Sequence, residues 1–226
     1  MSSEYIEEGY LRLTQVLDYF IPPELCNYLV RTGKKESGKI KRQTAKLGTR
    51  SHGLVEEDFL KGGYKLRKSD SYEVRQSMEA WEKFKKEYDV RIVDMEKRIY
   101  SKRYMVTARR DMLAVINGER TLLDLKITGA IRPKNWIQVA MNALFEEENG
   151  GEHIDKLAIL RLHKNLGDYE FVKRDNEDRY RVVFEGLLSA YRFFHEEQSS
   201  QKAKGTGEEY GSEYTNTEDS PTNSTL

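Results

Sequence analysis

The sequence predicts one domain of mixed α/β layers followed by a polar tail. A length of 226 residues suits a single domain with a sizeable core. Short apolar runs rich in β-branched residues alternate with stretches of helical periodicity, a pattern typical of mixed layers and not of a helix bundle. From Ser199 onward the chain has almost no aliphatic residue before Leu226. We therefore expect residues 1–198 to form the domain and residues 199–226 to be a disordered, mildly acidic tail.

The first third of the chain is expected to be mainly helical. Pro22-Pro23 opens a helix that runs to about Val30, because proline is favoured at the first helical position. A second helix is expected over Lys46–Leu60 and a third over Ser71–Tyr88.

Strands dominate the middle of the chain, where apolar, β-branched and aromatic residues are enriched. The expected strands are Val90–Tyr100, Tyr104–Ile116, Thr121–Thr128, Lys156–His163 and Tyr169–Lys173. A helix over Lys134–Glu148 follows Pro133 and stops at Asn149-Gly150-Gly151. Apolar residues at three- and four-residue steps then predict a closing helix from Tyr180 to about His195.

Composition excludes several classes of function. The single cysteine, Cys26, excludes a disulfide framework within the chain, a four-cysteine zinc site and a four-cysteine iron–sulfur cluster, so any metal must have oxygen and nitrogen ligands. No stretch approaches the apolar length of a membrane span, and no basic region leads into an apolar one at the N-terminus. We expect a cytoplasmic protein, or one in the host cytoplasm if it is viral. Acidic and basic residues balance at 38 each, so net charge alone does not favour nucleic-acid binding.

The dipeptide Asn117-Gly118 predicts a tight β-hairpin, because both residues accept the positive φ of a type I′ turn. The turn sets the strand register, which pairs Met112 with Leu123 and places Asp111 opposite Asp124. Two carboxylates are then expected to meet across the ladder, where like charges are unfavourable unless a cation compensates.

Lys126 is expected on the same sheet face as Asp124, because strand side chains alternate. Two acids and one ammonium suit phosphodiester hydrolysis with Mg²⁺ or Mn²⁺, which prefer carboxylate oxygens and lower the pKa of a bound water. In this interpretation Lys126 orients the water or stabilises developing negative charge. The alternative is a solvated strand face on which Asp124 and Lys126 form an ordinary surface pair.

Asp111, together with the run Leu122-Leu123-Asp124-Leu125-Lys126, resembles the split motif of PD-(D/E)xK nucleases. The spacing of the two acids resembles that of the RecB-like and phage exonuclease branch. The resemblance extends from about Leu13 to Phe194 and implies a restriction-endonuclease-like fold, with a mixed central β-sheet flanked by helices.

Three further positions agree with this branch. Gly48-Thr49-Arg50-Ser51-His52 resembles its upstream histidine motif, Glu96 its accessory acid before the first aspartate, and Gln138 its glutamine on the following helix. The resemblance implies His52, Asp111 and Asp124 as metal ligands, and Asp111, Asp124, Lys126 and Gln138 as catalytic residues.

Two departures from the family pattern concern the fit of the substrate. Ala108-Arg109-Arg110 stands where a glycine is common, and Asn142 stands where a tyrosine often follows the glutamine.

Each accessory residue also has a purely structural interpretation. His52 is either a metal ligand or a half-buried structural histidine, and Glu96 either belongs to the site or is a solvated charge. Gln138 and Asn142, one helical turn apart, either hydrogen-bond the site or a DNA backbone, or form a polar stripe.

A basic segment leads up to His52 and forms either a phosphate-binding surface or a solvated linker. Together with two arginines before Asp111, the residues expected to contact DNA are Lys39, Lys41, Arg42, Lys46, Arg50, Arg109 and Arg110.

The sequence thus predicts an Mg²⁺- or Mn²⁺-dependent deoxyribonuclease without an iron–sulfur cluster, with exonuclease activity favoured over endonuclease activity. Single-stranded DNA or duplex ends would be its partner, in recombination, repair or phage DNA processing. The alternative is a non-catalytic nucleic-acid-binding or assembly module on the same fold. An intact Asp111, Asp124 and Lys126 favour the enzyme.

Overall fold

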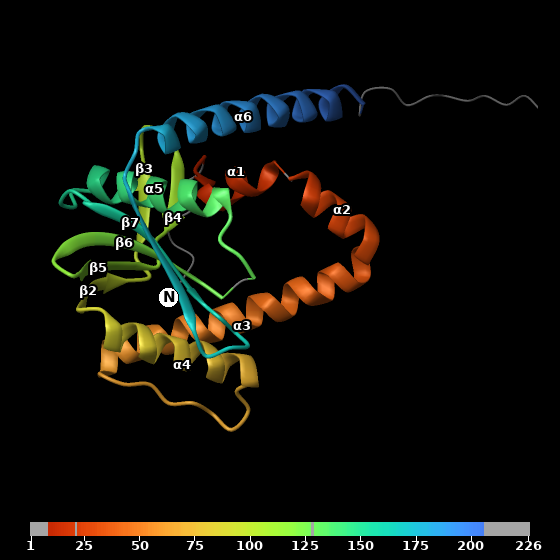
Figure 1. Cartoon of the computed structure of the whole chain (residues 1–226). Coiled ribbons are helices and arrows are strands. Elements are labelled where there is room, and N and C mark those ends of the chain that lie inside the picture. Colours follow the sequence, from red (N-terminus) through yellow and green to blue (C-terminus); the bar gives the residue numbers. More distant parts are fainter. Residues whose placement is uncertain (1–8, 21, 128, 206–226) are drawn as a thin grey trace, which may run out of the picture. The chain divides into compact units, whose positions relative to one another are not determined.

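The computed structural model describes residues 9–20, 22–127 and 129–205 (Figure 1). The chain divides into two compact units after Ser189. The first unit contains both sheets and all the residues considered as a site. The described part of the second unit is the C-terminal half of one helix.

The order of helices and strands agrees with the mixed α/β prediction. The helices are α1 (Leu13–Tyr19), α2 (Pro23–Thr32), α3 (Lys34–Lys61), α4 (Tyr72–Glu87), α5 (Pro133–Glu148) and α6 (Arg179–Gly205). The strands are β1 (Leu11–Arg12), β2 (Val90–Met95), β3 (Arg98–Ser101), β4 (Val106–Arg109), β5 (Met112–Ile116), β6 (Glu119–Lys126), β7 (Lys156–Leu162) and β8 (Tyr169–Asp175).

Two mixed sheets form within the described residues. The larger has the strand order β2-β5-β6-β7-β8, in which only the β6–β7 pair is parallel, and the smaller has the order β1-β4-β3. The turn between β5 and β6 has φ values of 50° at Asn117 and 83° at Gly118, and Met112 pairs with Leu123. The predicted hairpin and its register are therefore confirmed.

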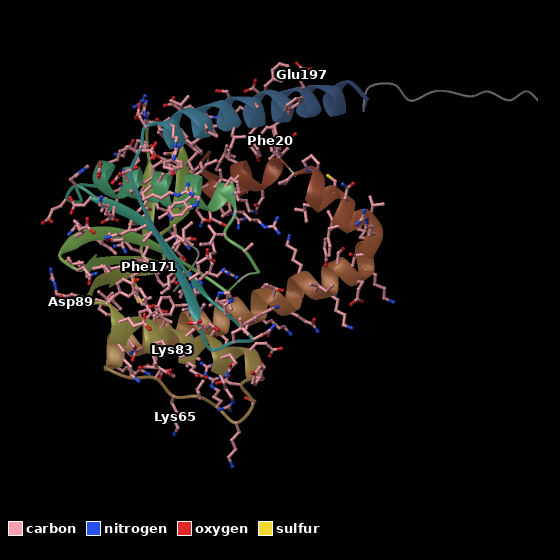
Figure 2. The ribbon with its side chains drawn as sticks, in the orientation of Figure 1. Phe20, Lys65, Lys83, Asp89, Phe171 and Glu197 are labelled. Carbon is pink, nitrogen blue, oxygen red and sulfur yellow. The ribbon has the colours of Figure 1, made fainter. Side chains whose placement is uncertain are left out.

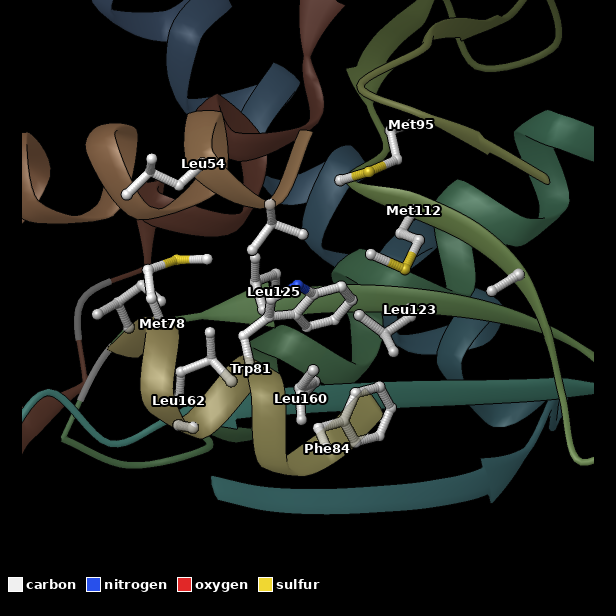
Figure 3. Close-up of a cluster of buried hydrophobic side chains, with 14 of the residues drawn as sticks. Leu54, Met78, Trp81, Phe84, Met95, Met112, Leu123, Leu125, Leu160 and Leu162 are labelled. Carbon is white, nitrogen blue, oxygen red and sulfur yellow. The ribbon is translucent and has the colours of Figure 1, made fainter. Parts of the chain in front are cut away.

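Helices cover both faces of the larger sheet, which confirms the predicted fold class. Figure 1 shows α3 and α4 together on one face and α5 on the other. Alternation along β6 sends Leu123 and Leu125 toward α3 and α4, where they join a buried cluster with Leu54 and Trp81 (Figure 3). Phe171 of β8, labelled in Figure 2, extends this cluster, with its ring centroid 5.1 Å from that of Phe84.

Helix α3 is longer than predicted and includes most of the basic segment, whose lysine side chains are exposed to solvent. The segment is rich in helix-forming Lys, Arg and Gln, and Glu36 in the first turn interacts favourably with the helix dipole. Gly33, with φ of 76°, separates α2 from α3. Gly48 and Thr49 consequently lie inside the helix and not at its start.

Both strands predicted before the hairpin are broken in the structure. The run from Val90 is interrupted at Glu96-Lys97, and the run from Tyr104 is interrupted at Arg110-Asp111. Glu96 has φ of 53°, a conformation uncommon for a residue with a side chain, so neither composition nor alternation indicated the break.

At the C-terminal end, α6 continues to Gly205, beyond the predicted end near His195. Residues 206–226, the greater part of the predicted tail, lie outside the described residues, and the domain boundary remains a prediction. None of the helices in the described ranges is both long and apolar enough to cross a membrane.

Candidate active site

The site lies where the ladder between β5 and β6 opens. The ladder ends at the pair Met112–Leu123, because β5 begins only at Met112. Asp111 is therefore not paired with Asp124 in the ladder, and the predicted direct opposition is wrong. The carboxylates are still electrostatic neighbours, since the charge of Asp111 contributes to the raised pKa of Asp124.

Leu125 connects the opened ladder to both neighbouring elements through its backbone. Its N–H donates to Asp111 Oδ2 at 2.8 Å, and its carbonyl accepts from His52 Nε2 at 3.0 Å. Beyond Leu123 the backbone of β6 has no partner in β5, so these side chains satisfy groups that would otherwise be unpaired. One residue of β6 thereby positions an acid that directly precedes β5 and an imidazole from α3.

His52, Glu96 and Asp111 converge on one point. His52 Nδ1 is 3.3 Å from Glu96 Oε1 and 4.0 Å from Asp111 Oδ2. One ligand atom from each of the three residues lies within 4.8 Å of the others. The side chains are 24%, 11% and 14% exposed, respectively, so the group is accessible but mostly enclosed. The structure thus brings Glu96, which the sequence indicated only weakly, into contact with the predicted residue His52.

Asp124 and Lys126 lie beside this group as an ion pair. Lys126 Nζ is 2.9 Å from Asp124 Oδ1 and 2.8 Å from Oδ2. Gln138 of α5 accepts a long hydrogen bond from the same ammonium, at 3.4 Å. Alternation along β6 therefore places Asp124 and Lys126 on one face, as predicted. Because the side chain of Asp124 is only 1% exposed, the alternative that Asp124 and Lys126 form a solvated surface pair is wrong.

The groups of the site shift one another's pKa values. Burial raises the pKa of Asp124 to about 7; the charge of Lys126 opposes the rise and that of Asp111 adds to it. Burial lowers the pKa of His52, but the hydrogen bond to Glu96 and the charges of Asp111 and Glu96 outweigh this and raise it overall. Burial likewise lowers the pKa of Lys126, but the charges of Asp124 and Asp111 raise it overall. Lys126 is therefore a cation at neutral pH.

The donor set fits a hard divalent cation. A carbonyl can only accept, so the bond to Leu125 requires the proton of a neutral His52 to be on Nε2, which leaves the lone pair of Nδ1 directed toward two carboxylates. That arrangement is favourable only if a proton or a metal ion lies among the three groups. In addition, the buried Oδ2 of Asp124 lies 2.8 Å from Nζ of Lys126 and has no other hydrogen-bonding partner among the described residues. Carboxylate oxygens with one imidazole suit Mg²⁺ or Mn²⁺.

Three arginines predicted to contact DNA have partners within the protein. The assignment of Arg110 is wrong, because its side chain is 1% exposed and pairs with Glu146 and Asp94. Arg50 is held by Asp70, at 2.9 and 2.8 Å. Arg109 is 61% exposed and pairs with Glu96 at 2.7 Å, so it remains at the edge of the site.

Lys39, Lys41, Arg42 and Lys46 are all exposed on α3. Figure 2 shows nitrogen-tipped side chains projecting along this helix. Lys39, Arg42 and Lys46 recur at three- and four-residue spacing on one side of α3, whereas Lys41 lies further round the helix. We call the four together the basic face of α3, and none of them is buried as Arg110 is.

The sequence did not single out Glu146 or Lys97, which contact each other at 3.0 Å, with Lys97 next to Glu96 in the chain. A signal was present: Gln138, Asn142 and Glu146 recur every fourth residue on one face of a largely buried helix. Polar residues at that spacing on a buried face require partners, and the predicted polar stripe continues one turn further than expected.

Comparisons with known proteins give remote similarities. No protein-family model and no curated protein matches the sequence. Among solved structures, an alkaline exonuclease (LHK-Exo) from Laribacter hongkongensis is similar at 13% identity and a TM-score of 0.47, covering 88% of this chain and 94% of that one. The same enzyme in complex with dAMP is similar at 14% identity and a TM-score of 0.45, with the same coverage. SSO0001 is similar at 14% identity and a TM-score of 0.40, covering 81% of this chain and 75% of that one. At such TM-scores these similarities carry no argument about function.

Proposed function

We propose that the protein is an Mg²⁺- or Mn²⁺-dependent nuclease that hydrolyses DNA phosphodiester bonds. The observation that carries the proposal is the convergence of His52, Glu96 and Asp111 on one point, beside the buried pair Asp124–Lys126. These are the acids, the histidine and the lysine of the nuclease motif that the sequence resembles, and they come from four separate elements or turns of the fold.

The ion would be held by His52, Glu96 and Asp111, with the buried Oδ2 of Asp124 as a further oxygen ligand. When bound, the ion supplies positive charge that polarises the scissile phosphodiester and acidifies a water molecule. Leu125 keeps its two neighbours oriented through the backbone, in the way that outer hydrogen bonds orient metal ligands in general.

Lys126 has a separate role in this proposal. Its raised pKa keeps it protonated, so it serves as a fixed positive charge or proton donor and not as a general base. Gln138 accepts from its ammonium and limits where the side chain can point. Positive charge held beside the scissile phosphate stabilises the additional negative charge of the transition state.

DNA would be bound through the basic face of α3, which belongs to the same helix as His52. Contacts of this kind are made to phosphates and depend little on sequence. The preference for DNA ends over internal sites follows from the sequence resemblance and not from the geometry of the site.

A non-catalytic nucleic-acid-binding module is the second candidate. Binding to phosphates needs only the basic face of α3. It would not require three ligand atoms directed at one another, nor a carboxylate buried to 1% exposure beside a lysine. Those features cost folding free energy and therefore favour a metal-dependent activity.

The test is incubation of the purified protein with end-labelled linear DNA and closed circular DNA, single- and double-stranded, in Mg²⁺, Mn²⁺ or EDTA. We expect cleavage only with a divalent ion, and none by Asp111→Asn, with Asp175→Asn on the far strand β8 as the matched control. Release of mononucleotides from ends would identify an exonuclease, and cutting of circles an endonuclease. Binding without cleavage in either metal would establish the second candidate instead.

A further inference from the structure

The two acids Glu96 and Asp111 lie where two paired runs of strand pass from one sheet to the other. Strand β2 leads into β3, and β4 leads into β5, with one interruption in each run. Backbone hydrogen bonds continue across the interruption: Glu96 N–H donates to Asp111 O at 2.8 Å, and Arg110 N–H donates to Lys97 O at 3.0 Å. Glu96-Lys97 and Arg110-Asp111 thus form a paired step of four residues between the two sheets.

The side chains of this step have partners in two different helices. Glu96 and Asp111 are close to His52 of α3, at 3.3 and 4.0 Å. Their chain neighbours Lys97 and Arg110 instead reach Glu146 of α5, at 3.0 and 2.9 Å. Each acid of the candidate metal site is therefore covalently adjacent to a cation held by one and the same carboxylate.

Glu146 is confined where it makes these contacts. Its side chain is 4% exposed, with Oε1 on Lys97 and Oε2 on Arg110. The chain after the helix packs closely against it, since a Cβ on Gly151 would lie 2.7 Å from Glu146 O and 2.9 Å from its Cγ.

Arg110 is confined as well. Its guanidinium is 1% exposed and binds Asp94 twice, through the carboxylate at 2.6 Å and the backbone carbonyl at 3.1 Å. The ion cluster therefore links α5, the end of β2 and the step.

Stability alone is a weak explanation for such a cluster. Buried ion pairs contribute little net stability relative to apolar residues of similar volume, because desolvation offsets their attraction. What they supply is a defined arrangement of the side chains, since their hydrogen bonds can be satisfied in few geometries. A site that binds an ion needs its carboxylates placed to within about 0.5 Å.

We propose that Glu146 is a positioning residue that fixes the Glu96 and Asp111 carboxylates for metal binding by holding Lys97 and Arg110 from behind. This inference rests on the proposed function, because it concerns the same metal site. Glu146 itself contacts neither the site nor His52 in the proposal; it acts through the two peptide units of the step.

The experiment compares Mn²⁺ binding by calorimetry with thermal unfolding in EDTA, on the full chain. Glu146→Ala alone would remove one of the two carboxylates that pair with a buried guanidinium and would be strongly destabilising. The decisive variant is therefore Arg110→Met with Glu146→Leu, which replaces the pair by apolar side chains of similar size. Lys97 and Asp94 are 44% and 45% exposed and remain solvated in this variant.

We expect the double variant to unfold within a few degrees of the wild type and to bind Mn²⁺ at least 10-fold more weakly. Glu146→Asp, which keeps the charge on a shorter side chain, is expected to show an intermediate loss. Asp58→Asn is the matched control: Asp58 pairs with Trp81 and Lys85, away from the step, so this variant should unfold earlier and keep its Mn²⁺ affinity.

Wild-type Mn²⁺ affinity in a folded double variant would overturn the positioning role while leaving the proposed function intact. Equal loss of affinity in Asp58→Asn would also overturn it, because affinity would then follow stability and not the step. If the wild type itself binds no Mn²⁺, the proposed function fails, and the positioning role fails with it.

Discussion

His52 donates from Nε2 to the backbone carbonyl of Leu125 at 3.0 Å, and this bond decides which ring nitrogen faces the acids. Nδ1 is left as the atom that binds either a proton or a metal ion. His52→Ala is therefore expected to weaken Mn²⁺ binding by on the order of 10-fold or more, as the loss of a ligand or its orienting shell does.

The pH dependence of this binding is a sharper test. The pKa of His52 is raised, so protons compete with the ion as the pH falls through a value above 6.5. Wild-type Mn²⁺ affinity, measured by calorimetry between pH 6 and 8.5, should fall more steeply with acidification than that of His52→Ala. His153→Ala, at a side chain 76% exposed, is the control. Parallel pH profiles in wild type and His52→Ala would show that Nδ1 is not a ligand.

Asp124→Asn is expected to stabilise the metal-free protein at pH 8. The folded pKa of Asp124 is about 7, above the usual value of the unfolded chain, so between about pH 4 and 7 the folded state keeps a proton that the unfolded state has released. At pH 8 the folded state holds a buried charge instead. Stability from this group is thus fully present below about pH 4 and is lost as the pH rises toward 7. Asparagine undergoes no such loss, and its amide oxygen can still accept a hydrogen bond from Lys126.

Thermal unfolding in EDTA measures this effect, with each kcal/mol corresponding to roughly 2–4 °C for a chain of this length. The melting temperature of Asp124→Asn should exceed that of the wild type at pH 8 and approach it near pH 4. Asp175, whose pKa is lowered by Lys156, provides the control, and Asp175→Asn should not be stabilising. A melting temperature of Asp124→Asn below that of the wild type at pH 8 would show that the buried charge of Asp124 does not destabilise the metal-free protein.

Lys126→Ala separates chemistry from metal binding. An ammonium cannot ligate a cation, so Mn²⁺ affinity at pH 8 should be retained, whereas kcat should fall by about 10²–10³-fold, the usual effect of removing one charge-stabilising donor. Lys134→Ala, on α5 but paired with the exposed Asp18, should change neither quantity. Undiminished kcat in Lys126→Ala would remove this residue from the site.

Neutralising the basic face of α3 should weaken DNA binding irrespective of sequence. In the variant with Gln at Lys39, Lys41, Arg42 and Lys46, the slope of log affinity against log salt is expected to decrease by about 0.9 for each lost phosphate contact on duplex DNA. Fluorescence anisotropy in 50–200 mM salt measures both quantities. The same change at Lys65, Lys68, Lys83 and Lys86, near and on α4, serves as a charge-matched control. Equal weakening in both variants would indicate general attraction and no specific surface.

The sequence was sufficient to predict features that depend on local geometry. Asn117-Gly118 specifies its turn through backbone conformation, and the register of β5 with β6 follows from it. Alternation then places Asp124 and Lys126 on one face, as the structure has them.

Features that depend on distant partners could not be predicted in this way. Arg110 is buried because Glu146 lies against it, although 36 residues separate the two in the chain. The interruption at Asp111 likewise lies opposite Glu96, to which it is hydrogen-bonded, and composition does not indicate the positive φ of Glu96. The predicted helix begins only at Lys46, because the first turns of α3 lack apolar periodicity although their residues favour helix.

Helix α3 also fixes the distance between the basic face and His52. Lys39 and His52 belong to one uninterrupted helix, so the 13 residue steps from one to the other correspond to about 20 Å along its axis at 1.5 Å per residue. That length equals about six nucleotides of one DNA strand at 3.4 Å each. If the basic face binds phosphates while His52 coordinates the metal ion, the rigid helix fixes the distance between the bound nucleotides and the bond that is cleaved. The helix would then define a minimum length of substrate that no change at the metal site could shorten.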